Sequence, residues 1–423
     1  MNTSRNSSLP VGAFTLVELM VSTAILAGLM VLLLNTVDQT QRVWTRATAK
    51  AGQFQAARGA FESLTRRMSQ ATLNAYWRPF DVEIIKTKAN IHYRRQSELQ
   101  FLSGPTSQIF GAAKLTPAPS IQIDTSSYPT HSVFFHAPLG YTEELESPSS
   151  KTPRFRSLDN MLVACGYFIE YGPDPDQPAF INRLAAFPAK KRFRLMELTV
   201  PGERLKTFDR GENAVVPAKQ RSSIAPRIID MNKKLYVGLV DQFRNATGTW
   251  VPPFWMGDAL KRESIDGSTG GTRFRYAHVR AENIIALVIL PKLPPKDRTP
   301  PGTDKLALAP SYRYDSARIL SGFPGKDADG VDVDNSARDN LLPPIVQVTM
   351  VAVDEVSMSR LPQGDDPIPF TKGLFEKAER ESDYTEDIKR LEKDLTQKKL
   401  NYRIFSTDVV IRGSKWSRDP EAP

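Results

Sequence analysis

The most uneven distribution of polar and apolar residues in this chain lies near its N-terminus. From Phe14 to Leu34 there are 21 residues with a single charge, Glu18. A helix rises about 1.5 Å per residue, so a helix of this length crosses the roughly 30 Å hydrocarbon core of a bilayer. The pattern therefore predicts a transmembrane helix over residues 14–34.

Residues 35–76 continue this helix with a different pattern. Apolar residues recur at steps of three and four from Val37 to Ala71, and most of the charged residues between them are basic. One apolar stripe with a charged opposite face is typical of an amphipathic helix. The two segments together predict one helix of about 60 residues, near 90 Å long. Its weak points, each costing up to about 1 kcal/mol relative to Ala, are Gly28, Gly52 and Gly59.

After Trp77 short apolar runs alternate with loops, and the chain holds 32 prolines and 24 glycines. This favours strands separated by long loops. We expect strands at 81–86, 98–102, 132–135, 162–171, 191–200, 283–290, 345–353 and 401–412. A helix over 382–400, with Ser382 as its N-cap, precedes the last strand, and loops occupy 201–272 and 293–344. The fold class is α+β, with the N-terminal helix packed on a β-rich globular domain over residues 77–423.

Glu18 is the residue that a simple membrane helix does not need. A lone charge at membrane depth costs roughly 2.5–3.5 kcal/mol, so the carboxylate requires a partner. A cut just before Phe14 would create an α-amino group, which is cationic at neutral pH. Such an amine on a neighbouring subunit, shifted along the membrane normal, reaches Glu18 more easily than an amine in the same first turn.

The run Ala13-Phe-Thr-Leu-Val-Glu18-Leu resembles the class III signal of type IV pilins and type II secretion pseudopilins. The resemblance implies that residues 1–13 are a leader removed by a prepilin peptidase. The cut would fall between Ala13 and Phe14, Phe14 would be N-methylated, and Glu18 would guide subunit docking. The usual residue before the cut is Gly, and here Gly12 stands one place early, so a cut between Gly12 and Ala13 is the alternative.

Two further stretches narrow the resemblance. Residues 54–71, with Phe61-Glu-Ser-Leu and Arg66-Arg-Met-Ser-Gln-Ala, are similar to the helix of J-type minor pseudopilins. Asn35 stands where major pilins usually carry a Pro, which also implies a minor subunit. The C-terminal part, with Val351-Ala-Val-Asp-Glu, Tyr402-Arg-Ile-Phe and Lys415-Trp-Ser, looks like the C member of the Verru_Chthon cassette proteins, which are pseudopilin-like proteins of Verrucomicrobia.

Two ordinary interpretations compete for the N-terminal segment. A cleaved secretory signal needs a shorter apolar core and a small-residue exit site, and the run ends instead in Leu34-Asn-Thr. An uncleaved signal anchor explains the length but gives no reason for Phe14-Thr-Leu-Val-Glu18. The short leader carries Arg5 and no acidic residue, which predicts that it stays inside while the rest of the chain is exported.

Composition excludes several classes of function. The net charge is +9, yet Lys and Arg form no long run, so we expect no nucleic-acid partner. Cys165 is the only cysteine, which excludes an internal disulfide and a Cys-ligated zinc site, and its apolar neighbours indicate a buried thiol. The four histidines are scattered and no nucleotide-binding or hydrolase motif is present, so we expect no enzyme.

Two loops are candidate ligand sites. Trp250, Phe254 and Trp255 form an aromatic cluster that could stack on a sugar or peptide, or could simply pin a loop to the core. Asp327, Asp329, Asp332 and Asp334 alternate around a Gly turn, and such carboxylates suit Ca²⁺, although the EF-hand spacing is absent. The alternative is a solvated acidic turn, and no other cofactor is expected.

The sequence therefore predicts a minor pseudopilin-like subunit of a bacterial type II secretion or type IV pilus-like fibre. It would be a single-pass protein of the inner membrane with a periplasmic C-terminal domain. Its expected partners are the prepilin peptidase, other pseudopilins or pilins, and the inner-membrane assembly platform. The alternative is a membrane-anchored tip adhesin or substrate-binding protein that uses the Trp250–Trp255 loop.

Overall fold

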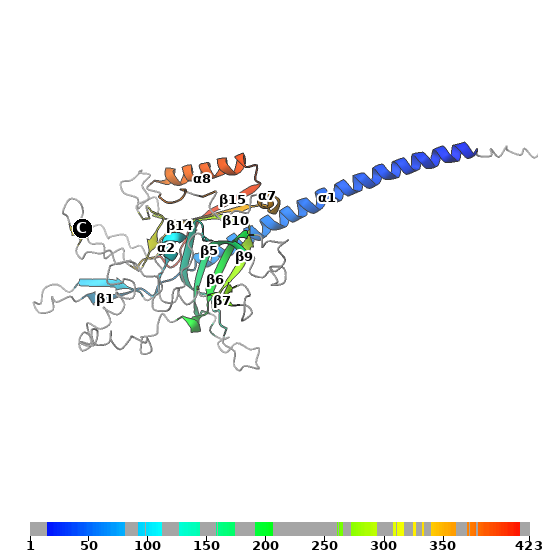
Figure 1. The fold of residues 1–423 in the computed structure, drawn as a ribbon. Coiled ribbons are helices and arrows are strands. Elements are labelled where there is room, and N and C mark those ends of the chain that lie inside the picture. The colour runs from blue at the N-terminus through cyan, green and yellow to red at the C-terminus, as the bar shows by residue number, and fades with distance from the viewer. Residues whose placement is uncertain are drawn as a thin grey trace, which may run out of the picture. The chain divides into compact units, whose positions relative to one another are not determined.

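The computed structural model describes residues 15–80, 92–97, 99–111, 127–143, 158, 160–173, 191–205, 260, 262–264, 272–293, 308–309, 311–316, 325–326, 332–333, 340–360, 370–371, 373–377 and 380–414. Contacts divide the chain into two compact units, residues 1–55 and 56–423. The architecture is mixed, with one long N-terminal helix and a β-rich remainder (Figure 1).

Helix α1 spans Leu16–Met68, 53 residues without a break. The predicted continuity across the apolar and amphipathic segments is confirmed, but the helix ends well before residue 76. The reason lies in the backbone partners that follow it. The Thr72 N–H donates to the His136 carbonyl at 2.9 Å, and the Ser69 carbonyl accepts from the Arg412 N–H at 3.0 Å. These bonds tie the chain to the β-rich unit in place of another helical turn.

A six-stranded antiparallel sheet forms the larger part of the β-rich unit. Its strand order is β11-β3-β4-β5-β6-β9. The bounds are Tyr314–Asp315 for β11, Leu102–Pro105 for β3, His131–Pro138 for β4, Leu162–Pro173 for β5, Lys191–Val200 for β6 and Ala277–Glu282 for β9. The predicted strand at 191–200 matches β6 residue for residue. The strand predicted at 98–102 is wrong, because the Phe101 N–H donates to the Ser316 hydroxyl and β3 begins only at Leu102.

A second, three-stranded antiparallel sheet has the order β10-β14-β15. Its strands are Ile284–Lys292, Ile345–Val353 and Tyr402–Val410. Strand β10 is buried along its whole length, as its unbroken apolar run predicts, and it approaches β3, β4, β5 and β6 of the larger sheet.

Asn283 is the point at which the chain leaves one sheet for the other. Its φ of 58° lies in the left-handed region, which Asn tolerates better than most residues. The Asn283 N–H donates to the Phe193 carbonyl of β6 at 2.7 Å, and its carbonyl accepts from the Val353 N–H of β14 at 3.0 Å. The side-chain amide adds a bond to Glu355 at 2.7 Å. One residue therefore joins both sheets through its backbone.

Helix α8, Glu381–Gln397, lies over the small sheet (Figure 1) and bonds to it through Tyr384 and Thr349 at 2.6 Å. The prediction that Ser382 caps it is wrong. The N-cap is Arg380, whose backbone N–H donates to the Asp383 carboxylate at 2.9 Å. An acceptor three residues into a helix satisfies the cap in this way.

The remaining elements are short. They are the two-stranded pairs β1–β2 (Tyr76–Phe80, His92–Gln96), β7–β8 (Arg262–Ser264, Thr272–Phe274) and β12–β13 (Gly325–Lys326, Asp332–Val333), the helices α2 (Thr106–Gly111) and α7 (Glu355–Ser359), and the 3-10 turn η3 (Gly202–Arg204). The expected strand at 81–86 lies outside the described residues.

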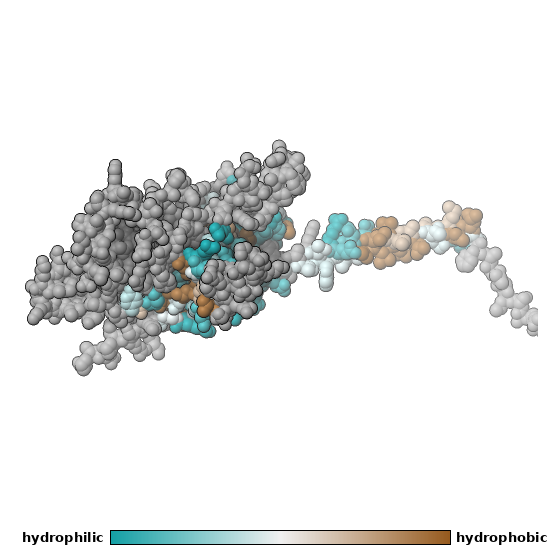
Figure 2. Space-filling model, turned by 90° about the horizontal axis from the view of Figure 1, so that it is seen from below, coloured by the Kyte–Doolittle hydropathy of each residue, from teal (hydrophilic) through white to brown (hydrophobic). Residues whose placement is uncertain are grey.

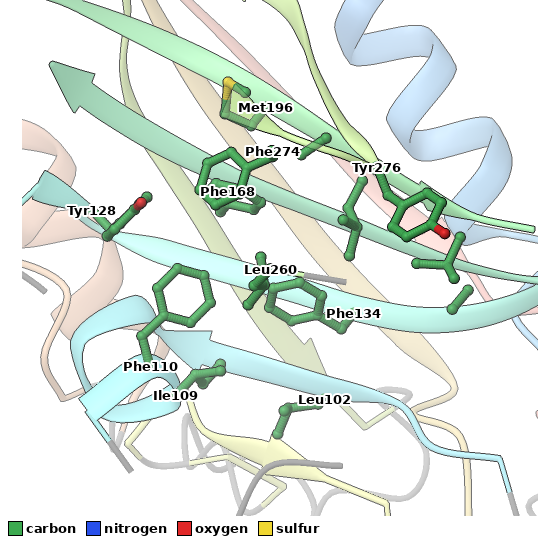
Figure 3. Packing of buried hydrophobic residues seen from close by; sticks show 14 of the residues in the cluster. Leu102, Ile109, Phe110, Tyr128, Phe134, Phe168, Met196, Leu260, Phe274 and Tyr276 are labelled. Carbon is green, nitrogen blue, oxygen red and sulfur yellow. The ribbon is translucent and has the colours of Figure 1, made fainter. Parts of the chain in front are cut away.

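An aromatic core covers one face of the larger sheet (Figure 3). Phe110 of α2 and Phe274 of β8 both pack edge-on against Phe168 of β5, with ring centroids 5.6 and 5.7 Å apart. Edge-to-face pairs at this distance add about 0.5–1.5 kcal/mol beyond the burial of their area. This core supports the sheet without any disulfide in the described residues, where Cys165 is a buried free thiol.

Candidate functional site

The N-terminal part of α1 is the candidate site, because it is apolar and uncovered. The helix is long and apolar enough to cross a membrane within Leu16–Thr45. Figure 2 shows hydrophobic surface gathered along this part of α1 and hydrophilic surface further along. Its large side chains are open in this chain, with Leu26 65 % exposed and Leu32 64 % exposed. An exposed apolar surface of this kind is typical of a segment that lies in a membrane or against a partner.

The hydroxyl groups within this stretch are satisfied by the helix itself. Ser22 and Thr23 both donate to the Leu19 carbonyl at 3.0 Å, and Thr36 donates to the Leu32 carbonyl at 2.8 Å. A hydroxyl bonded back to its own helix does not face an apolar medium unpaired. These polar residues are therefore compatible with a membrane environment.

The sequence shows Glu18 as a lone charge at the start of the helix, but in the structure its carboxylate has hydrogen-bond partners. Thr15 immediately precedes α1, and its hydroxyl oxygen accepts from the Glu18 N–H at 3.3 Å. In return the Glu18 carboxylate accepts from the Thr15 N–H and from the Thr15 hydroxyl, both at 3.2 Å. This reciprocal arrangement is a capping box. The carboxylate is thus held in place by Thr15, and no salt bridge to a cation of the described residues neutralises its charge.

Thr15 is a residue that the sequence reasoning missed. The signal that identifies it is Thr-x-x-Glu directly before an apolar run, which is the pattern of a capping box. Its consequence is geometric, since the cap fixes where the first turn begins and which way the Glu18 carboxylate faces.

The C-terminal part of α1 is bound to the sheets of its own unit. The Arg67 guanidinium pairs with the Glu197 carboxylate of β6. The same carboxylate accepts from the Tyr167 hydroxyl of β5 at 2.7 Å and lies 3.4 Å from Arg280 of β9. Phe61 packs on Phe405 of β15 with ring centroids 5.8 Å apart. These contacts attach the helix end to both sheets.

This cluster is structural in character. Burial and the neighbouring Glu197 carboxylate raise the pKa of the Tyr167 hydroxyl above its usual range, so it stays a proton donor. Burial also raises the pKa of the Cys165 thiol to about 12. A thiol that stays protonated is a poor nucleophile, which agrees with the prediction of a buried, inert cysteine.

The two buried histidines are likewise part of the packing. The His131 Nδ1 accepts from the Ile289 N–H of β10 at 3.1 Å, and its Nε2 lies 2.8 Å from the Phe375 carbonyl. His136 lies five residues along β4, so the two rings point to opposite faces of the strand. Burial lowers the pKa of each to about 4, and both are neutral at pH 7.

The other predicted site residues fall mostly outside the described part of the chain. These are Gly12, Ala13 and Phe14 at the predicted cut, Trp250, Phe254 and Trp255 of the aromatic loop, and Asp327, Asp329 and Asp334 of the acidic loop. Asp332 lies in β13. Among the described residues no group of three or more His, Cys, Asp or Glu could hold a metal ion. Cleavage, aromatic ligand and calcium binding therefore stay predictions.

No protein-family model, curated protein or solved structure matches this chain.

Proposed function

We propose that this protein is a minor pseudopilin-like structural subunit. The chain is inserted in the inner membrane by the N-terminal part of α1, cut before Phe14 by a prepilin peptidase, and assembled with other pseudopilins into an envelope fibre. Its globular unit, with a pilin-like fold, faces the periplasm. The single observation that carries the proposal is a carboxylate in the first turn of α1, at the start of a stretch that is otherwise apolar and exposed.

The proposed assembly rests on Glu18, whose carboxylate has hydrogen-bond donors but still needs a cation. Thr15 donates two hydrogen bonds to one oxygen of the Glu18 carboxylate, but it adds no positive charge. A carboxylate moved into a low-dielectric helical bundle still requires a cation. The freed amine of Phe14 on a neighbouring subunit supplies that cation, and the surrounding apolar side chains supply the contact area.

The first test is the N-terminus of the mature protein. Co-expression with a prepilin peptidase followed by mass spectrometry should give a chain that starts at N-methylated Phe14. An intact Met1, or a cut beyond Leu34, would remove the pseudopilin proposal. A start at Ala13 would preserve it with the cut moved to the alternative position.

The second test separates charge from helix capping. Glu18→Gln retains the capping geometry, because Gln serves at this capping-box position as well as Glu does, but it removes the charge. Glu62→Gln is the matched control, since Glu62 is an exposed carboxylate of the same helix, 2.8 Å from Arg58. We expect loss of fibre incorporation for Glu18→Gln and normal incorporation for Glu62→Gln. Equal incorporation of both variants would show that Glu18 is not the docking group.

A further inference from the structure

Trp44 is an exposed aromatic residue at the far end of the apolar part of α1. Its side chain is 73 % exposed. One half-turn earlier, Arg42 pairs with Asp38 at 2.8 Å, and both of these side chains are more than half exposed. The next two helical turns bring Arg46 and Lys50 in the sequence. An aromatic ring thus lies within a stretch whose net charge is positive.

The spacing along the helix places this group at a defined depth. Residues 19–37, between Glu18 and Asp38, are 19 residues without a charge. At about 1.5 Å per residue they span roughly 28 Å, close to the thickness of the hydrocarbon core. Trp44 lies six residues beyond Asp38, which is about 9 Å along the axis.

The direction of helical side chains shortens that distance. A long side chain on a helix leans toward the N-terminus and covers the preceding turn, roughly 5 Å back along the axis. The indole then lies within the headgroup layer, which adds about 5–8 Å to each side of the core. Trp is enriched at this level of a membrane because its ring is apolar and its N–H is polar.

We propose that Trp44 and Arg42 form an interfacial anchor, which sets how deeply α1 sits in an anionic phospholipid bilayer. The Trp44 indole lies in the headgroup layer on the side where the globular unit emerges. Arg42 binds the headgroup phosphates. The inference rests on the proposed membrane insertion but not on cleavage or fibre assembly.

The native cysteine makes the depth measurable in the full chain. Cys165 is buried and its thiol pKa is raised to about 12, so a water-soluble maleimide should leave it unlabelled. Single cysteines are placed at Leu29, Gln41 and Thr48, all of which are exposed in this chain. The protein is reconstituted in vesicles of phosphatidylethanolamine and phosphatidylglycerol. We expect protection at residues 29 and 41 and rapid labelling at residue 48.

Removing the Trp44 ring should reduce the difference in labelling between residues 41 and 48. In Trp44→Ala the labelling rate at residue 41 should rise toward that at residue 48, which corresponds to a shift of about one turn, or ~5 Å. Val43→Ala is the matched control, since Val43 is 66 % exposed on the adjacent position, and it should leave the boundary unchanged. Trp44→Phe should retain most of the protection.

Three results would overturn the anchor. Unchanged labelling at residue 41 in Trp44→Ala would show that the ring does not set the depth. If Trp44→Ala changed only the recovery of other subunits from cells, Trp44 would be a contact to another protein and not to the membrane. Equal protection in purely zwitterionic vesicles would remove the role of the anionic headgroups. Rapid labelling at all three positions would instead contradict membrane insertion itself, while failed cleavage or assembly in cells would leave the vesicle result untouched.

Discussion

Helix α1 has one continuous backbone but two different surroundings. In its N-terminal part Leu29 is 54 % exposed, whereas Leu64, near its C-terminal end, is fully buried. The two carboxylates associated with these parts differ in the same way. Among the described residues Glu18 bonds to Thr15, three positions earlier, while Glu197 accepts from β5 and pairs with α1 and β9. Glu197 therefore helps to maintain the fold, whereas Glu18 has no cationic partner among the described residues, which suits the docking role that we propose for it.

Burial of the C-terminal part of α1 should give the largest effect. Leu64→Ala removes a buried side chain, so we expect the free energy of unfolding of the globular unit to fall by about 3 kcal/mol. Leu29→Ala should leave it unchanged. Urea denaturation of both variants in detergent, with unchanged m-values, measures the difference. Equal losses for the two variants would mean that the halves of α1 do not differ in the way their exposure indicates.

The Glu197 cluster should come next. Glu197→Gln removes the charge that pairs with Arg67 and Arg280, whose side chains are 31 % and 47 % exposed. Water screens these partners in part, so we expect a loss of about 2 kcal/mol rather than the larger cost of a fully buried pair. Glu18→Gln is the comparison and should not change the unfolding of the globular unit. A loss for both variants, or for neither, would end the distinction between the two carboxylates.

Acid should weaken the globular unit before it affects the exposed helix. Burial lowers the pKa of His131 and His136 from 6.5 to about 4. Between these values the unfolded chain binds more protons than the folded chain, so stability is complete above pH 6.5 and falls as the pH decreases toward 4. From pH 7.5 to pH 6 the two residues together should cost about 1.5 kcal/mol. Chemical denaturation at the two pH values tests this, and replacing His136 with Gln should remove about half of the difference.

The parts of the fold that the sequence predicts well are those fixed by local pattern. The helical steps of three and four identify α1, and the runs that become β6 and β14 end directly at Pro201 and Asp354, which bound them. What could not be predicted depends on residues far apart in the chain. The sequence around Arg67 does not predict its pairing with Glu197. The sequence around Asn283 does not predict that its backbone N–H and carbonyl bond to β6 and β14.

The errors at the ends of elements have the same cause. Where a helix or strand begins depends on which acceptor or donor lies close in space, as with Asp383 for the Arg380 N–H before α8 and Ser316 for the Phe101 N–H before β3. Ser382 looks like a good cap by residue type, but Asp383 already fills that role. At the candidate site the apolar span and Glu18 follow from the hydropathy and charge pattern, whereas the role of Thr15 lies in hydrogen bonds that this pattern does not show.

The smallest predicted effect concerns Thr15 itself, and it separates capping from docking. Thr15→Val removes the hydroxyl that accepts from the Glu18 N–H, and loss of such a cap costs a helix about 1 kcal/mol. The cost should stay within the first turn of α1, because the bonds of the cap join Thr15 and Glu18. Hydrogen exchange should therefore become faster at the Glu18 amide, which the hydroxyl caps, with urea unfolding of the globular unit unchanged. Thr15→Ser, which retains the hydroxyl, is the control.

If the cap aims the Glu18 carboxylate at its partner, Thr15→Val should also slow fibre incorporation although Glu18 keeps its charge. Thr15→Ser should then be incorporated at the normal rate. Normal incorporation despite a frayed first turn would mean that the charge of Glu18 is sufficient for docking and that the cap serves the helix only.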